Sequence, residues 1–150
     1  MKGFIDDIAD LATGNAAFRR VLYTGQHLQL VLMTLKPGQE IGEETHKGND
    51  QFFRIEKGRG EAWIDGKPTK IKRDDAVFVP AGACHNIVNT GSKSLRFYTL
   101  YSPPHHLDGV LRETKADAES RPEHFDGKTT EPRPPAPSKA SAKTRAELAR

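Results

Sequence analysis

The most constraining feature of this sequence is a series of short apolar or alternating segments in the middle of the chain, separated by residues typical of turns. The segments are AFRRVLYTG, HLQLVLMTL, DQFFRIE, GEAWI, KPTKIK, AVFVP, HNIVN and SLRFYTLY. In DQFFRIE, Gln51, Phe53 and Ile55 are spaced two apart and therefore share one face of a strand. Asp65-Gly66, between GEAWI and KPTKIK, is typical of a type I′ hairpin turn. Short strands at even spacing, with almost no helix between them, predict an all-β barrel or sandwich.

The N-terminal residues follow a different pattern. Ile5, Ile8 and Leu11 lie at helical spacing, which predicts a short helix over residues 5–12. Acidic residues interrupt the apolar core that a signal peptide needs, and no apolar run approaches the roughly 20 residues of a membrane span. The single cysteine, Cys84, excludes an internal disulfide and a cysteine-based zinc finger. We therefore expect a cytoplasmic protein that does not associate with membranes.

The C-terminal part of the chain has a composition unlike that of the strands. From Glu113 onward, Phe125 and Leu148 are the only hydrophobic residues larger than alanine, and five of the ten prolines occur there. Such a segment buries too little apolar surface to offset the entropy of ordering it. The predicted organisation is a folded domain with its barrel at about residues 20–101, an arm that packs loosely, and a disordered tail rich in proline, alanine and lysine, with bounds 1–112, 113–126 and 127–150.

Net charge bears on the class of partner. The formal charge is +3 and the isoelectric point is about 9.0, which by themselves suggest nucleic-acid binding. From residue 128 onward, however, six basic and two acidic residues supply a charge of +4, which leaves −1 for the rest of the chain. No aromatic residues alternate with these basic ones, so we do not expect a nucleic-acid partner.

Four polar residues lie where neighbouring strands are expected to converge. Glu44 and His46 are two residues apart, so on a strand they share a face. Gln51 follows a Lys-Gly-Asn turn signal, and a hairpin there would return it beside His46. His85 follows a Pro-Ala-Gly turn that can direct it inward. Imidazole and carboxylate groups suit Fe(II), Mn(II), Co(II), Ni(II) or Zn(II), although such a pair also occurs by chance. The alternative is a metal-free cluster of hydrogen-bonded polar groups.

The stretch that contains these residues resembles the two signature motifs of the cupin superfamily. The first motif combines a glycine, a His-x-His pair, a glutamate and a second glycine. Gly38, His46 and Gly58 are in place. Glu44 replaces the first histidine and Gln51 replaces the glutamate, so one carboxylate is kept.

The second motif is Pro-x-Gly-x-x-His-x-x-x-Asn, preceded by a glycine. Pro80, Gly82, His85 and Asn89 match it in full, whereas Asp74 stands in place of the leading glycine. The chain is most similar to small, single-domain bacterial cupins described as mannose-6-phosphate-isomerase-like. The segments DQFFRIE, VPAGACHN and YTLYSPPHH carry that resemblance.

The resemblance implies a double-stranded β-helix, or jelly-roll barrel, that binds a divalent metal ion such as Mn, Fe, Zn, Ni or Co. It implies four metal ligands, namely Glu44, His46, Gln51 and His85. The expected function is that of a metal-dependent isomerase or lyase acting on a sugar or a related hydroxy or keto compound that chelates the metal. An iron-dependent dioxygenase and a non-catalytic binding or sensing barrel remain alternatives. An exposed edge strand and the habits of many cupins predict a homodimer.

Further residues are weaker candidates for roles in the site. Tyr98 and Tyr101 lie on opposite faces of the last strand, so one of them can supply an acid near the metal, and the alternative role is packing. His105 and His106 follow two prolines and form either a lid or, as we expect, ordinary surface. Cys84 precedes a predicted ligand and should be a buried small hydrophobic residue that faces away from the site.

Overall fold

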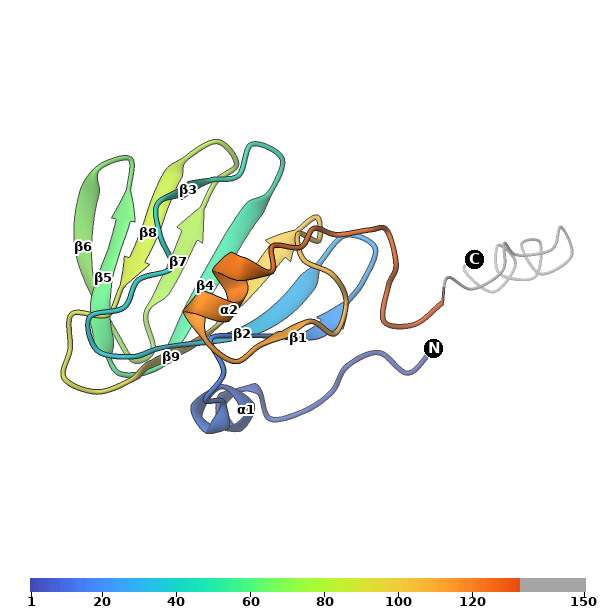
Figure 1. Ribbon diagram of the computed structural model, residues 1–150, viewed down its shortest axis with the longest axis horizontal. Helices are drawn as coiled ribbons and strands as arrows, with labels where there is room; N and C mark the ends of the chain where they lie inside the picture. The colour runs from blue at the N-terminus through green and yellow to red at the C-terminus, as the bar shows by residue number, and fades with distance from the viewer. Residues whose placement is uncertain (133–150) are drawn as a thin grey trace, which may run out of the picture.

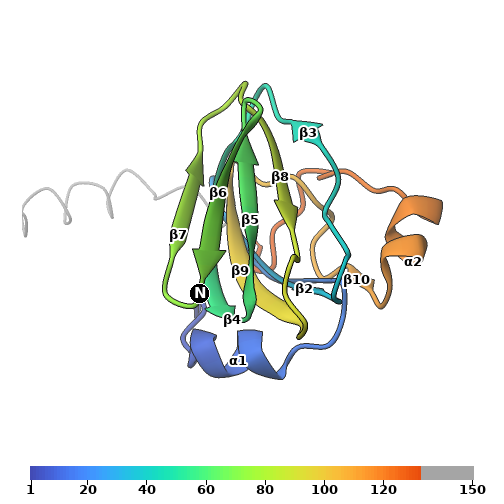
Figure 2. The same ribbon diagram turned by 90° about the vertical axis from the view of Figure 1, so that its left-hand side faces the viewer.

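Two antiparallel β-sheets lie face to face and are flanked by two short helices (Figures 1 and 2). The computed structural model describes residues 1–132 of the chain. The larger sheet has the order β10-β1-β2-β9-β4-β7, with bounds Leu111–Arg112, Arg19–Thr24, Gln29–Leu35, Leu95–Ser102, Asp50–Lys57 and Ala76–Val79. The smaller sheet has the order β3-β8-β5-β6, with bounds Glu44–Thr45, Cys84–Val88, Arg59–Ile64 and Lys67–Lys72. This arrangement confirms the predicted all-β jelly roll.

Alternation along the strands places the core between the two sheets. Phe53 and Ile55 on β4 are fully buried, as is Phe97 on β9, and Ile87 on β8 faces them from the smaller sheet. The face of DQFFRIE predicted to point inward does so, because Gln51 is also only 2% exposed. The apolar interior therefore continues into a polar region at the Gln51 end of β4.

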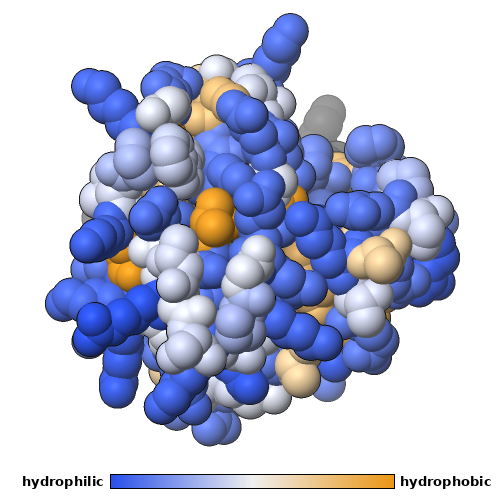
Figure 3. Space-filling view, turned by 60° about the vertical axis from the view of Figure 1, so that its left-hand side comes forward, coloured by the Kyte–Doolittle hydropathy of each residue, from blue (hydrophilic) through white to orange (hydrophobic). Residues whose placement is uncertain are grey.

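Turn residues determine the smaller sheet locally. Asp65 and Gly66 both have positive φ, at 47° and 80°, as a type I′ turn requires, and they join β5 to β6 as predicted. The edge strands β6 and β7 lie side by side at one open side of the sandwich (Figure 2). The surface on the side of β5 and β6 is mostly hydrophilic, with separate hydrophobic residues (Figure 3).

Helix α1 (Ile8–Gly14) begins three residues later than predicted. The reason is that Asp7 caps it: its side chain accepts a hydrogen bond of 3.0 Å from the amide of Asp10. Ile5, which was expected to lie on the buried face of the helix, is 95% exposed. Among residues 1–132, no helix is long and apolar enough to cross a membrane.

The predicted loose arm is anchored more firmly than its composition indicated. It contains helix α2 (Lys115–Ser120), capped by Thr114, and then Glu123. The Glu123 side chain is 4% exposed and lies 2.9 Å from His106 Nδ1, 3.2 Å from Arg112 Nη2 and 3.7 Å from Arg19 Nη1. One buried carboxylate thus joins the arm to the barrel, which an analysis of apolar content cannot detect.

The first residues of the predicted tail also contact the barrel. Thr130 exchanges hydrogen bonds with Thr24 on β1, at 2.9 and 2.7 Å. The carboxylate of Glu131 accepts hydrogen bonds from the amides of Lys2 and Gly3 and from the Tyr23 hydroxyl. The expectation of disorder from residue 127 was therefore wrong for residues 127–132. The rest of the predicted tail, residues 133–150, lies outside the described residues.

Candidate metal centre

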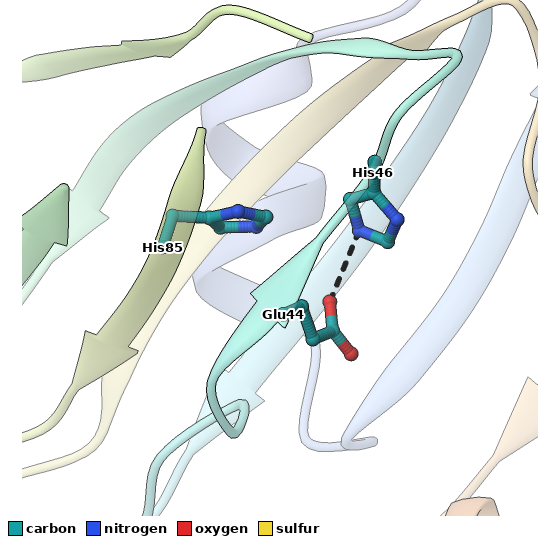
Figure 4. Close-up of side chains that lie close together, drawn as sticks. All are labelled: Glu44, His46 and His85. Carbon is teal, nitrogen blue, oxygen red and sulfur yellow. Dashed lines mark hydrogen bonds and ion pairs between the residues drawn. The ribbon is translucent and has the colours of Figure 1, made fainter. Parts of the chain in front are cut away.

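Three potential metal ligands come together on the inner side of the smaller sheet. Glu44 on β3 pairs in register with His85 on β8, and His46 lies two residues beyond Glu44 (Figure 4). One ligand atom from each of these residues lies within 4.8 Å of the others. His46 Nε2 and Glu44 Oε2 are 3.1 Å apart, and the ring centroids of His46 and His85 are 5.3 Å apart.

Gln51 reaches this region by a different route from the predicted one. The expected hairpin between His46 and Gln51 does not form, because β3 pairs with β8 in the smaller sheet whereas β4 pairs with β7 and β9 in the larger one. Gln51 instead approaches from the facing sheet, in register with Tyr101, whose ring centroid is 5.8 Å from that of His46. Gln51 Nε2 donates a hydrogen bond of 3.0 Å to Thr99 Oγ1, which leaves the amide oxygen as its free ligand atom.

Two buried atoms at this site have no hydrogen-bond partner. These are His85 Nε2 and Gln51 Oε1, on side chains that are 1% and 2% exposed. An unpaired buried polar group costs about 1–3 kcal/mol, so proteins rarely keep one without a reason. His85 Nδ1 lies 3.5 Å from the carbonyl of Ala83, which favours the tautomer with the lone pair on Nε2. A nitrogen lone pair, an amide oxygen and the Glu44 carboxylate form a donor set that fits a divalent metal ion.

The electrostatics favour the protonation states that metal binding needs. Burial, reinforced by the nearby His46, lowers the pKa of His85, so that its imidazole is neutral at pH 7. Burial opposes ionisation of Glu44, but the hydrogen bond and charge of His46 outweigh it and lower the pKa of the carboxyl. A neutral imidazole and an ionised carboxylate are the ligand forms.

Aromatic and imidazole rings form a wall beside these ligands. The Tyr101 ring stacks on that of His105, with centroids 5.3 Å apart and planes at 20°, and His105 lies 4.4 Å from His46 by the same measure. Tyr101 is 3% exposed, and His106 Nε2 lies 3.3 Å from its hydroxyl. Burial raises the pKa of Tyr101 well above its usual value and lowers that of His105 to about 4. At neutral pH the wall is therefore uncharged.

Comparison with known proteins gives the family. A profile described as "Cupin domain" matches residues 31–101. The crystal structure of BH2720 from Bacillus halodurans is 40% identical in sequence and has a TM-score of 0.79, and the match covers 80% of this chain and 96% of that one. This chain belongs to the cupin family.

Two curated relatives add to this assignment. The cupin is 44% identical over 124 residues to YrkC, an uncharacterized protein of Bacillus subtilis, and the match covers 78% of this chain and 66% of YrkC. It is 37% identical over 68 residues to a protein of Thermotoga maritima named oxalate-binding protein, over 45% of this chain and 56% of the relative. The second match spans the region of the barrel but only about half of each protein.

The remaining candidates divide between the two faces of the barrel in this cupin. Tyr101 faces the candidate metal site, whereas Tyr98 is paired on β9 with Arg54 and lies on the other face. Cys84 faces away from the site as expected, but it is partly exposed rather than buried, and its thiol donates a hydrogen bond of 2.9 Å to Glu43 Oε1. The hydrogen bond to Glu43 raises the pKa of the thiol, which argues against a nucleophilic role.

His105 and His106 do not form ordinary surface in this cupin, since His106 is 5% exposed. The cause is Gln29, a fully buried residue at the start of β2. Its amide oxygen accepts hydrogen bonds from the amides of His105 and His106, at 3.1 and 2.9 Å, and its nitrogen donates to the His106 carbonyl at 2.8 Å. These three bonds hold the histidine pair over Tyr101. A lone glutamine in the apolar segment HLQLVLMTL was the available signal.

Proposed function

We propose that this cupin binds one divalent metal ion through Glu44, His46, Gln51 and His85 and uses it to hold a small, oxygen-rich ligand. The observation that carries the proposal is the pair of buried, unpartnered atoms, His85 Nε2 and Gln51 Oε1, on side chains from facing sheets. Mn(II), Fe(II), Co(II), Ni(II) and Zn(II) all accept this mixture of nitrogen and oxygen donors. When bound, such an ion polarises a carbonyl or hydroxyl oxygen and thereby favours proton transfer at the neighbouring carbon.

The surrounding side chains bind and shield the ligand. Tyr101 and His105 present a stacked pair of rings beside His46, and a ring face of this kind suits the apolar side of a small hydroxy or keto compound. Gln29 fixes the backbone of His105, so the wall is positioned before a ligand arrives. This geometry supports an isomerase or lyase that acts on a chelating hydroxy or keto compound. The name of the oxalate-binding relative is consistent with a chelating oxygen ligand. The resemblance to mannose-6-phosphate-isomerase-like cupins stays a prediction, because a fold does not determine a reaction.

A non-catalytic binding protein is the second candidate, and one observation favours it. Glu123 is the carboxylate nearest to the wall on the side of His106, but its oxygens already face Arg19, Arg112 and His106. A carboxylate held in this way is a poor general base. Recognition without turnover would need only the ligands and the wall.

Elemental analysis of untagged protein, reconstituted separately with each of the five metals, tests the metal centre. We expect one ion per chain in the wild type and, in His46→Ala and His85→Ala, metal affinity lower by at least about 10-fold. His27→Ala is the matched control, because His27 is exposed on the turn between β1 and β2 and should leave the metal content unchanged. A wild-type protein that retains none of the five ions would refute the proposal. Oxygen consumption by the iron form with candidate hydroxy and keto acids separates the dioxygenase alternative.

A further inference from the structure

Arg19 is a buried cation that points into the barrel from the start of β1. It lies two residues before Val21, which belongs to the hydrophobic core, so both side chains share the inner face of the strand. The Arg19 side chain is 13% exposed, whereas its neighbour Arg20 is exposed. The guanidinium carbon lies 5.4 Å from the ring centroid of Phe18, which is itself buried and supports the side chain from beneath.

The hydrogen-bonding capacity of Arg19 is not used by the protein. Its Nε is buried and has no hydrogen-bond partner among residues 1–132, and its Nη1 approaches Glu123 only to 3.7 Å. Arg112 pairs with the same carboxylate at 3.2 Å and also donates to the Arg121 carbonyl at 2.9 and 3.2 Å. Arg112 therefore accounts for the position of Glu123, and Arg19 is left with donors available to another acceptor.

The charge of Arg19 acts on the candidate metal site from the opposite sheet. Its field contributes to the lowered pKa of Glu44 on β3 and acts on Tyr101 and His106 as well. Glu44 and Glu123 balance Arg19 and Arg112 in charge, since the histidines of the wall are neutral. A divalent ion would leave this interior with an excess of positive charge. A negatively charged ligand removes that excess.

We propose that Arg19 binds a carboxylate of the ligand, so that the natural ligand is a small organic acid with an oxygen next to its carboxylate. This class comprises 2-hydroxy acids, 2-keto acids and small dicarboxylates. The inference rests on the proposed metal centre, which would bind the neighbouring oxygen, and it narrows the ligand class by requiring an anion. Guanidinium and carboxylate groups match as a planar, two-point pair, which explains an arginine rather than a lysine at this position.

Binding of glycolate and oxalate to the manganese-loaded protein, measured by calorimetry, tests this role. Glycolamide is the neutral probe, because it keeps the hydroxyl and replaces the carboxylate by an amide. We expect the wild type to bind glycolate more tightly than glycolamide. In Arg19→Met, glycolate binding should weaken by about 10- to 100-fold, with glycolamide binding and the manganese affinity little changed. Arg19→Lys, which keeps the charge but loses the fork of donors, should retain part of the preference.

The controls separate this inference from the metal centre and from folding. Arg20→Met, on the outer face of the same strand, should leave all three affinities unchanged. Arg19→Met should fold, because Glu123 keeps Arg112 as a partner, and the manganese affinity of the variant reports this directly. A wild-type protein that binds no manganese or other divalent ion overturns the metal centre and the subsite together. A loaded wild type that binds glycolate and oxalate no better than glycolamide, or an Arg19→Met variant that keeps the preference, overturns the subsite alone.

Discussion

Replacing Glu123 by glutamine tests whether one carboxylate anchors the C-terminal arm. The substitution keeps the shape of the side chain but removes the charge that faces Arg19, Arg112 and His106. Breaking a buried ion pair from one side costs about 3–5 kcal/mol when the partner charge is left without compensation. Arg112 keeps its bonds to the Arg121 carbonyl and Arg19 is 13% exposed, so we expect a loss of about 2–3 kcal/mol in the free energy of unfolding. For a domain of this size, that corresponds to a decrease in Tm of roughly 8–12 °C.

Urea unfolding of the metal-free variants at pH 7 measures this loss. Glu119→Gln is the matched control, because Glu119 is 69% exposed and pairs with Lys115 at 4.0 Å, and such a pair contributes at most about 0.5 kcal/mol. Burial raises the pKa of Glu123, but His106, Arg19 and Arg112 outweigh it, so that the net pKa is lowered. Its stabilisation should thus be complete above the usual carboxyl pKa of 4.5 and disappear as the pH falls below that value. A Glu123→Gln variant as stable at pH 7 as Glu119→Gln would refute the reasoning.

Four further predictions concern the histidines, the helix cap, the buried glutamine and the oligomer. Burial lowers the pKa values of His85 and His106, and that of His105 to about 4, so the metal-free protein should lose stability as the pH falls from about 6.5 towards 4; an unchanged urea midpoint would contradict this. Asp7→Ala should lower the free energy of unfolding by about 1 kcal/mol through loss of the α1 cap, measured by urea unfolding. Gln29→Leu leaves two amides and a carbonyl unpaired and should cost at least about 2 kcal/mol, with faster amide exchange at His105 and His106. Sedimentation equilibrium tests the homodimer, which would be excluded by a mass of one chain at micromolar concentration.

Local patterns in the sequence predicted most strands of the barrel. Alternation in DQFFRIE gave the inward face of β4, and Asp65-Gly66 gave the turn between β5 and β6, because both signals act between neighbouring residues. The hairpin between His46 and Gln51 was wrong, since the pairing of β3 with β8 is a contact between residues far apart in the sequence. The cupin motifs nevertheless pointed to the same four ligand positions that the two sheets bring into one region.

The parts that the sequence did not reveal depend on single polar residues. Gln29 positions the segment after β9, and Glu123 fastens a segment with hardly any apolar residues. Arg19 attracted no attention because an arginine in a strand is usually solvated, and only its burial beside Val21 distinguishes it from Arg20. Hydrophobic patterns report burial of apolar surface and are silent on polar anchors of this kind.

The origin of the candidate ligands from two different sheets has a thermodynamic consequence. Glu44, His46 and His85 belong to the smaller sheet and Gln51 to the larger, so an ion bound by all four would clamp the halves of the sandwich against separation. Occupancy and resistance to melting then become one quantity, and an ion present at 100 times its dissociation constant adds about 2.7 kcal/mol. A melting screen over metals, followed by organic acids on the best metal, can thus rank the natural occupants of this protein before any reaction is known.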